Sequence, residues 1–221
     1  MKYEAIIFDF NGVLLLDRDW HEEAWNMVSQ ELRGVPFSAR EAEEHIHGRT
    51  PKETFLFLAP DANAEKLKEL NLLKEQTYQH IAQSADVDFS LAPGAEELFE
   101  LLQKNHIKFT IATSSPLINL DFYFKYLGLE KWFEWEKAVY DDGALASKPA
   151  PDMYLEAAKR LGVGIQRSIV VEDSLSGIQA ALNAGAGKVI LVSQKRGMAI
   201  PTGVTKAISS LSGITLADFE H

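Results

Sequence analysis

The sequence predicts an α/β protein with a doubly wound, Rossmann-like parallel sheet and a small helical domain inserted after its first strand. The apolar run Ala5–Phe8 is typical of a strand buried on both faces of a parallel sheet, and it stops at Asp9, before an Asn-Gly pair that suits a turn. A mainly helical stretch follows. Beyond about residue 86, buried strands alternate with helices, which indicates repeated βα units with right-handed crossovers.

Residues 16–85 are expected to form the inserted helical domain, and residues 1–15 with 86–221 the α/β core. Apolar side chains at helical spacing predict helices over His21–Leu32 and Glu65–Ile81, and no convincing strand pattern appears between Asp17 and Ser84. An insertion of about seventy residues is far longer than an ordinary connection between strands. This length favours a separate helical cap.

The rest of the chain supplies the other predicted strands and helices. Pro93 and Gly94 precede a helix and Gly162 stops another, as expected at helix boundaries. The predicted strands are Ile107–Ala112, Ala138–Tyr140, Ile169–Val171 and Lys188–Val192. The predicted helices are Ala95–Lys104, Leu117–Leu127, Pro151–Leu161 and a segment that ends at Asn183, and the tail Ala207–His221 is expected as a weak helix or an extended end.

The composition excludes several classes of function. The 221 residues carry a formal net charge of -10, which argues against a nucleic-acid or membrane partner held by non-specific electrostatics. With no cysteine, disulfides, thiolate metal sites and thiol nucleophiles are excluded. No apolar run approaches the roughly eighteen residues of a membrane span, and the first residues do not resemble a secretory signal, so a cytoplasmic location is the simplest expectation. The sequence gives no indication of oligomeric state.

Polar side chains stand where several of the predicted strands end. In open α/β sheets, ligands bind outside the carboxyl ends of the strands, so these side chains are candidate site residues. Carboxylates are typical ligands of Mg²⁺. A nucleophilic carboxylate, hydroxyl donors, a cation and an acidic pair are the parts of a phosphoryl-transfer site. These residues are Asp9, Thr113, Ser114, Ser115, Lys148, Glu172 and Asp173.

Each of these residues also has a structural interpretation. Asp9 suits a turn, Thr113 suits a helix cap, Lys148 suits a solvated loop, and Glu172 suits the positive end of a helix dipole. The order of all of them along one chain favours the catalytic interpretation.

With these residues in place, the chain resembles the haloacid dehalogenase superfamily, in particular the branch with a helical cap after the first strand, which includes β-phosphoglucomutases and many small-molecule phosphatases. The resemblance covers essentially the full length. Asp9-Phe10-Asn11-Gly12-Val13 is similar to the first motif of the family, Thr113 to the second, Lys148 to the third, and Glu172-Asp173-Ser174 to the fourth.

The resemblance implies a Mg²⁺-dependent phosphatase of a small phosphorylated metabolite. Asp9 would attack the phosphoryl group to form an aspartyl phosphate. The carboxylates of Asp9 and Asp173 and the main-chain carbonyl of Asn11 would ligate Mg²⁺, with Glu172 acting directly or through a metal-bound water. Thr113 and Lys148 would hold the phosphate oxygens.

Asn11 departs from the family pattern. Phosphatases and mutases of the family usually carry a second aspartate there, which protonates the leaving oxygen and later activates water. An amide cannot do this, and losing a general acid-base group typically costs a factor on the order of 10²–10⁴ in rate. Ordinary alkyl phosphates are therefore expected to react slowly, and substrates with good leaving groups to suffer least.

Four alternatives follow from the resemblance and from Asn11. A phosphomutase would use the same site and keep water from the aspartyl phosphate. Phosphonate hydrolases of the superfamily use a cap lysine as a Schiff base; Lys52, near the expected substrate loop, is the lysine to consider, with a solvated lysine as its plain interpretation. A dehalogenase needs no metal and fits the acidic pair Glu172-Asp173 less well. A weakly active phosphate-binding regulatory protein is the fourth.

Residues of the expected cap are candidates for substrate binding. His21 takes the place of a hinge-side histidine in sugar-phosphate members of the branch, and a partly exposed helix histidine is the alternative. The segment His47-Gly48-Arg49-Thr50 resembles the substrate-specificity loop of the cap. There Gly48 would permit close approach and Arg49 would clamp an anionic group, with a surface arginine in a turn as the alternative.

Overall fold

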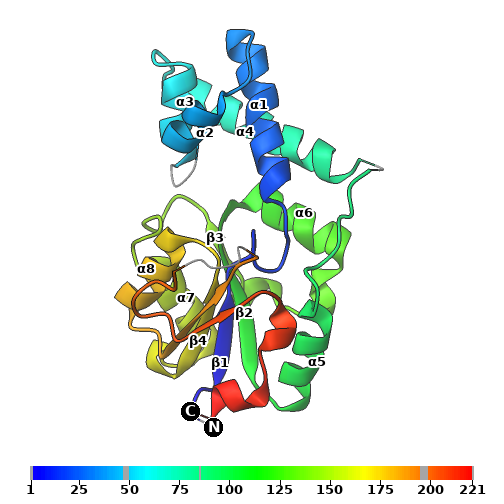
Figure 1. Cartoon of the computed structure of the whole chain (residues 1–221), viewed down its shortest axis with the longest axis vertical. Coiled ribbons are helices and arrows are strands. Elements are labelled where there is room, and N and C mark those ends of the chain that lie inside the picture. The colour runs from blue at the N-terminus through cyan, green and yellow to red at the C-terminus, as the bar shows by residue number, and fades with distance from the viewer. Residues whose placement is uncertain (1, 47–49, 85, 195–198, 221) are drawn as a thin grey trace. The chain divides into compact units, whose positions relative to one another are not determined.

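The computed structural model describes residues 2–46, 50–84, 86–194 and 199–220 (Figure 1). The chain divides into two compact units, one made of Met1–Leu16 with Ser90–His221 and the other of Asp17–Phe89. The first unit is the α/β core, and the regular structure of the described residues of the second unit is helical. No helix among the described residues is long and apolar enough to cross a membrane.

The core unit is built on a six-stranded parallel sheet with the strand order β3-β2-β1-β4-β5-β6. The predicted doubly wound α/β class is thereby confirmed, and β1 lies between β2 and β4 (Figure 1). The strands are β1 Ala5–Phe8, β2 Lys108–Pro116, β3 Val139–Asp141, β4 Ser168–Glu172, β5 Lys188–Val192 and β6 Lys206–Ile208.

Helices cover both faces of this sheet, with α5 and α6 on one side and α7 and α8 on the other (Figure 1). Alternate residues of β1 face opposite layers because successive side chains of a strand point to opposite faces. Ile7 belongs to the apolar cluster with α7 and α8, whereas the ring of Phe8 packs 5.8 Å from Phe99 of α5. The helices are α5 Ala95–Lys104, α6 Leu117–Leu127, α7 Asp152–Leu161 and α8 Leu175–Ala184.

The carboxyl-terminal tail differs from its prediction. It contains the short edge strand β6 and two single turns of 3-10 helix, Leu211–Gly213 and Leu216–Phe219, in place of a weak helix or a plain extended end. The backbone carbonyl of Phe219 accepts hydrogen bonds from the amides of Lys2 and Tyr3. These long-range bonds fix the tail beside the start of the chain, and local sequence pattern does not reveal them.

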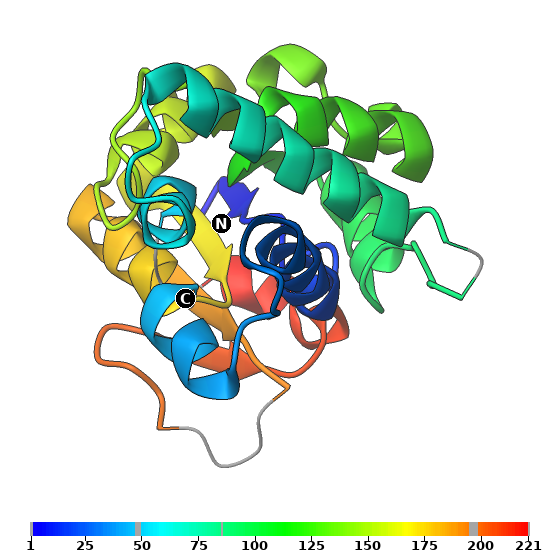
Figure 2. The same cartoon turned by 90° about the horizontal axis from the view of Figure 1, so that it is seen from above.

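The helical unit consists of α1 Arg18–Arg33, α2 Ala39–His45, α3 Pro51–Leu58 and α4 Ala64–Ala82, and α1 packs against α4 (Figures 1 and 2). The ends of its helices follow the sequence. Gly34 ends α1 in a left-handed conformation (φ 77°), where glycine has no steric penalty, and Ser38 forms a capping box with Glu41 at the start of α2. The core of the unit holds Trp25, Val28, Phe37, Phe55, Leu58 and Leu70.

Candidate active site

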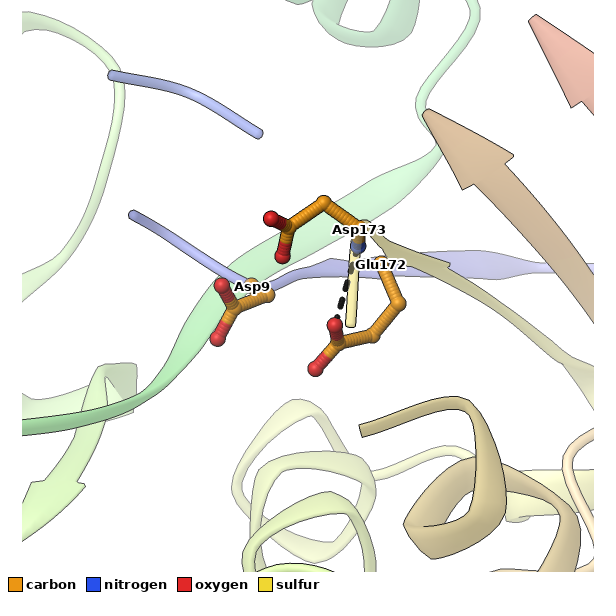
Figure 3. A group of neighbouring side chains, drawn as sticks. All are labelled: Asp9, Glu172 and Asp173. Atoms are coloured by element: carbon orange, nitrogen blue, oxygen red, sulfur yellow. Dashed lines mark hydrogen bonds between the residues drawn. The ribbon is translucent and has the colours of Figure 1, made fainter. Parts of the chain in front are cut away.

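The carboxylates of Asp9, Glu172 and Asp173 surround a common space at the carboxyl edge of the sheet (Figure 3). Asp9 follows β1 directly, and its amide donates to the carbonyl of Val171 at 3.0 Å, which sets it level with the end of β4. One ligand oxygen from each of the three carboxylates lies within 4.8 Å of the others. Because β1 and β4 are neighbours and parallel, their terminal acids meet as the sequence predicted.

Lys148, in the loop before α7, links two of these acids. Its Nζ donates to Asp9 Oδ1 at 2.6 Å and to Glu172 Oε1 at 2.7 Å, and its side chain is only 7% exposed. Burial lowers the pKa of Lys148, but the charges of Asp9 and Glu172 outweigh burial, so the net shift is upward and the ammonium stays charged. Burial raises the pKa of Asp9 well above its usual value, and Lys148 only partly opposes that shift.

Glu172 is fully buried and accepts hydrogen bonds at both carboxylate oxygens. Oε1 accepts from Lys148 and, at 2.7 Å, from the hydroxyl of Tyr154 on α7. Oε2 accepts from the amides of Asp173 and Ser174 at 2.9 and 3.0 Å and from the Ser174 hydroxyl at 3.0 Å. Burial alone would raise the pKa of Glu172. The charge and hydrogen bond of Lys148, together with the other hydrogen-bond donors, outweigh burial, so the net shift of this pKa is downward.

Two glycines make room for the acidic pair. A Cβ on Gly12 would lie 2.2 Å from Asp173 Oδ2, and Gly12 also has a φ of +80° that favours glycine. A Cβ on Gly177, in the first turn of α8, would lie 1.6 Å from Glu172 Oε1. The two carboxylates occupy their positions because neither glycine has a side chain.

The end of β2 brings hydroxyl groups to the side chain of Asn11. Asn11 Oδ1 accepts from Ser115 Oγ at 2.6 Å and from Thr113 Oγ1 at 3.4 Å, and Asn11 Nδ2 donates to the hydroxyl of Tyr123 at 2.9 Å. Ser114 points to the other face of the strand, where its exposed hydroxyl lies 3.8 Å from Met153 Sδ. Of the three predicted hydroxyls, the structure thus brings Thr113 and Ser115 together and turns Ser114 away.

In the helical unit, His21 of α1 belongs to a polar cluster. Its Nδ1 lies 2.8 Å from Lys74 Nζ, its Nε2 lies 3.3 Å from Asp17 Oδ2, and its ring stacks on Tyr78 at 4.1 Å. An ammonium only donates, so Nδ1 accepts and Nε2 carries the hydrogen toward Asp17. Lys74 is buried and also pairs with Glu75 at 3.1 Å.

The predicted substrate loop is described only at its end. Gly48 and Arg49 lie outside the described residues. Thr50 is the N-cap of α3 and forms a capping box with Glu53, and Lys52 is exposed in the first turn of that helix. The structure therefore gives Thr50 a helix-capping role and leaves Lys52 on the surface.

Three residues with clear contacts escaped the sequence analysis. Tyr154 and Tyr123 lie on the buried sides of predicted helices, where sequence alone does not distinguish them from ordinary core residues. Lys74 lies within a helix rich in charged residues, where a lysine is expected to be solvated. Tyr154 contacts Glu172, Tyr123 contacts Asn11, and Lys74 contacts His21, all from distant parts of the chain. The spacing of apolar residues in the helix Pro151–Leu161 is the sequence signal that could have placed Tyr154 on its buried side.

The acidic cluster fits a hard divalent cation. Its donors are carboxylate oxygens, the ligands that Mg²⁺ takes, and Lys148 forms ion pairs with two of the three carboxylates, those of Asp9 and Glu172. Asp173 is exposed, whereas both oxygens of Glu172 already accept hydrogen bonds.

Comparisons with known proteins agree with this fold. The family model described as haloacid dehalogenase-like hydrolase matches residues 3–185, so the chain belongs to this hydrolase family, and the resemblance found in the sequence is confirmed. The chain thus belongs to a family of enzymes.

Particular relatives are similar over most of their length. A phosphorylated carbohydrates phosphatase of Thermotoga maritima is 30% identical over 189 residues, covering 84% of this chain and 83% of that protein. The β-phosphoglucomutase of Bacillus subtilis is 30% identical over 190 residues, covering 82% and 80%. The crystal structure of a HAD hydrolase of family IA, variant 3, from Entamoeba histolytica superposes with a TM-score of 0.90 at 36% identity, covering 98% and 97%.

Proposed function

We propose that this hydrolase is a Mg²⁺-dependent phosphatase of a small phosphorylated metabolite, and that it acts through an aspartyl phosphate on Asp9. The observation that carries the proposal is the Lys148 ammonium, held 2.6 Å from Asp9 Oδ1 beside the acidic cluster. Phosphorylated carbohydrates are the favoured substrate class because a relative with 30% identity is named as their phosphatase.

In this proposal Asp9 is the nucleophile and the surrounding residues hold the phosphoryl group. A carboxylate and a phosphate dianion repel each other, and Lys148 offsets part of that repulsion at short range. The hydroxyls of Thr113 and Ser115, at the end of β2, donate to phosphate oxygens when substrate replaces their present partner. Glu172 keeps Lys148 in place through its own hydrogen bond.

The metal would be held by the carboxylates of Asp9 and Asp173 and the carbonyl of Asn11, with Glu172 in support. When bound, Mg²⁺ supplies the positive charge that lets a phosphate dianion approach a carboxylate. The donor chemistry of the cluster supports this assignment.

The helical unit, Asp17–Phe89, supplies substrate selection in this proposal, as a cap on the core. His21 is its candidate contact, because the polar cluster around it fixes the tautomer and the ring orientation. In this proposal the loop that contains Gly48, Arg49 and Thr50 also selects the substrate. Ser114, which is exposed near the end of β2, is a further candidate substrate contact. A second candidate function, phosphomutase, is favoured by the similarity to the Bacillus subtilis β-phosphoglucomutase.

The proposal is tested by phosphate release from a panel of sugar phosphates and one aryl phosphate, with Mg²⁺ and with chelator. We expect metal-dependent release that Asp9→Ala abolishes, whereas Asp121→Ala, a matched change on the exposed side of α6, leaves it intact. Conversion of a sugar phosphate into its isomer without phosphate release would indicate the mutase. Release that survives Asp9→Ala, or no reaction with any substrate, would refute both.

A further inference from the structure

The side chain of Asn11 is fixed between β2 and α6. Ser115 and Thr113 donate to its carbonyl oxygen, and its amide nitrogen donates to the hydroxyl of Tyr123. Tyr123 is fully buried, and its ring stacks on that of Phe10 at a centroid distance of 4.2 Å. The turn after β1 is therefore tied to the sheet through an amide that both donates and accepts.

An amide at this position neither gives nor takes a proton. The other groups that the structure describes around Asp9 are committed elsewhere: Glu172 accepts hydrogen bonds at both oxygens, Lys148 donates to Asp9 and Glu172, and Asp173 is a proposed metal ligand. Within the described part of the core, the cluster around Asp9 thus offers a nucleophile, hydrogen-bond donors and a cation, with no group placed to protonate a departing oxygen.

We propose that Asp9 takes its phosphoryl group much faster from acyl phosphates, or from other donors whose leaving group departs as a stable anion, than from the sugar phosphates of the proposed function, and that the aspartyl phosphate then persists. This inference rests on the proposed function, in which Asp9 is the nucleophile. In the first step a bond forms between Asp9 Oδ and phosphorus, and the bond from phosphorus to the acyl oxygen breaks. The carboxylate leaves with the electron pair and needs no proton.

The second step is the slow one. Water attacks phosphorus, the bond to Asp9 Oδ breaks, the carboxylate is regenerated and a proton from the water passes to the solvent. A general base accelerates the attack of water, and a site that lacks this base is slower by a factor on the order of 10²–10⁴. The donor's leaving group matters only in the first step. There a carboxylate, whose acid has a pKa of about 4, departs without a general acid, whereas an alcohol is far less acidic and needs one.

The test uses the full chain with Mg²⁺ and acetyl phosphate as the probe, followed by intact mass and by phosphate release. We expect rapid addition of one phosphoryl group to each protein molecule, and then slow loss. Asn11→Asp shortens the lifetime of the phosphorylated form by at least about tenfold, because it restores a proton acceptor where Thr113 and Ser115 already point. Tyr123→Phe loosens Asn11 without adding an acid, so the lifetime stays long.

The outcomes separate this inference from the proposed function. Steady phosphate release without accumulation of phosphorylated protein, or an equally short lifetime in Tyr123→Phe, would overturn the inference and leave the phosphatase proposal standing. Two results would overturn both proposals. One is that Asp9→Asn still becomes phosphorylated. The other is that neither the native protein nor Asn11→Asp reacts with any donor.

Discussion

Replacing Gly177 by alanine is the sharpest structural test of how the acidic pair is held. Gly177 lies in the first turn of α8, and an added Cβ would lie 1.6 Å from Glu172 Oε1 and 2.0 Å from its Cδ. The Glu172 carboxylate must therefore leave its position. Its move breaks the hydrogen bonds from Lys148, Tyr154 and the amides of the following turn.

Two opposing effects determine how much Gly177→Ala changes the free energy of unfolding. Alanine is a better helix former than glycine by about 1 kcal/mol, which favours the variant. Breaking a buried charged pair costs about 3–5 kcal/mol, because one charge is left without its partner. The steric effect is the larger, so we expect Gly177→Ala to lose about 2–4 kcal/mol of unfolding free energy. Turnover falls as well, since Lys148 loses the partner that holds it beside Asp9.

Denaturant unfolding and phosphate release measure the two effects in the same preparations. Gln179→Ala, on the exposed side of α8, is the matched control, because it improves helix propensity at a side chain that donates to Asn183 and not to Glu172. A Gly177→Ala variant at least as stable as the native protein, with unchanged turnover, would refute the close packing of Gly177 on the carboxylate.

Three further predictions concern other contacts. Tyr154→Phe removes a hydrogen bond to the buried Glu172 carboxylate, so denaturant unfolding should show a loss of about 1.5–3 kcal/mol. Asp173→Asn should weaken Mg²⁺ binding in calorimetry without substrate by at least about tenfold, with the fold retained because the side chain is exposed. Hydrogen bonds, the largest effect being that of the Ser38 backbone, lower the pKa of Glu41 from 4.5 to about 2. The helical unit should therefore lose stability as the pH falls through this range. Thermal unfolding of Glu41→Gln should lack this part of the pH dependence.

Each of these has a plain contradicting result. Native stability in Tyr154→Phe would mean that its hydroxyl contributes nothing to holding Glu172. Unchanged Mg²⁺ affinity in Asp173→Asn would remove this residue from the metal site. For Glu41, the carboxylate form is favoured by folding, so its contribution is full above pH 4.5 and lost toward pH 2; identical acid profiles of the native protein and Glu41→Gln would contradict this.

The parts of the site that sequence predicts are those fixed by strand ends. Asp9, Thr113 and the pair Glu172-Asp173 follow short apolar runs, and parallel neighbouring strands bring such residues to one edge of the sheet. This is why the fold class and the acidic cluster could be anticipated without coordinates. Lys148 sits on a loop, and its bridging position could be expected only through the family resemblance.

Other contacts depend on packing between distant segments. Tyr154 reaches Glu172 from the buried face of a helix, and Tyr123 reaches Asn11 from another, and nothing in the local sequence separates these tyrosines from ordinary core residues. Buried Lys74 was missed for the opposite reason, because a lysine within a charged helix reads as solvated. The short strand Lys206–Ile208 was missed because its backbone pairing with β5 defines it more than its composition.

The central claim is that hydrolysis passes through a covalent phosphoryl group on Asp9, and the stereochemical course at phosphorus tests it most directly. The measurement uses an aryl phosphorothioate made chiral with two oxygen isotopes, hydrolysed by the native protein with Mg²⁺ in water enriched in the third isotope, so that the released thiophosphate is itself chiral. Each in-line displacement inverts the configuration at phosphorus. Transfer to Asp9 followed by attack of water therefore predicts retention, whereas inversion would show direct attack by water and contradict the covalent role of Asp9.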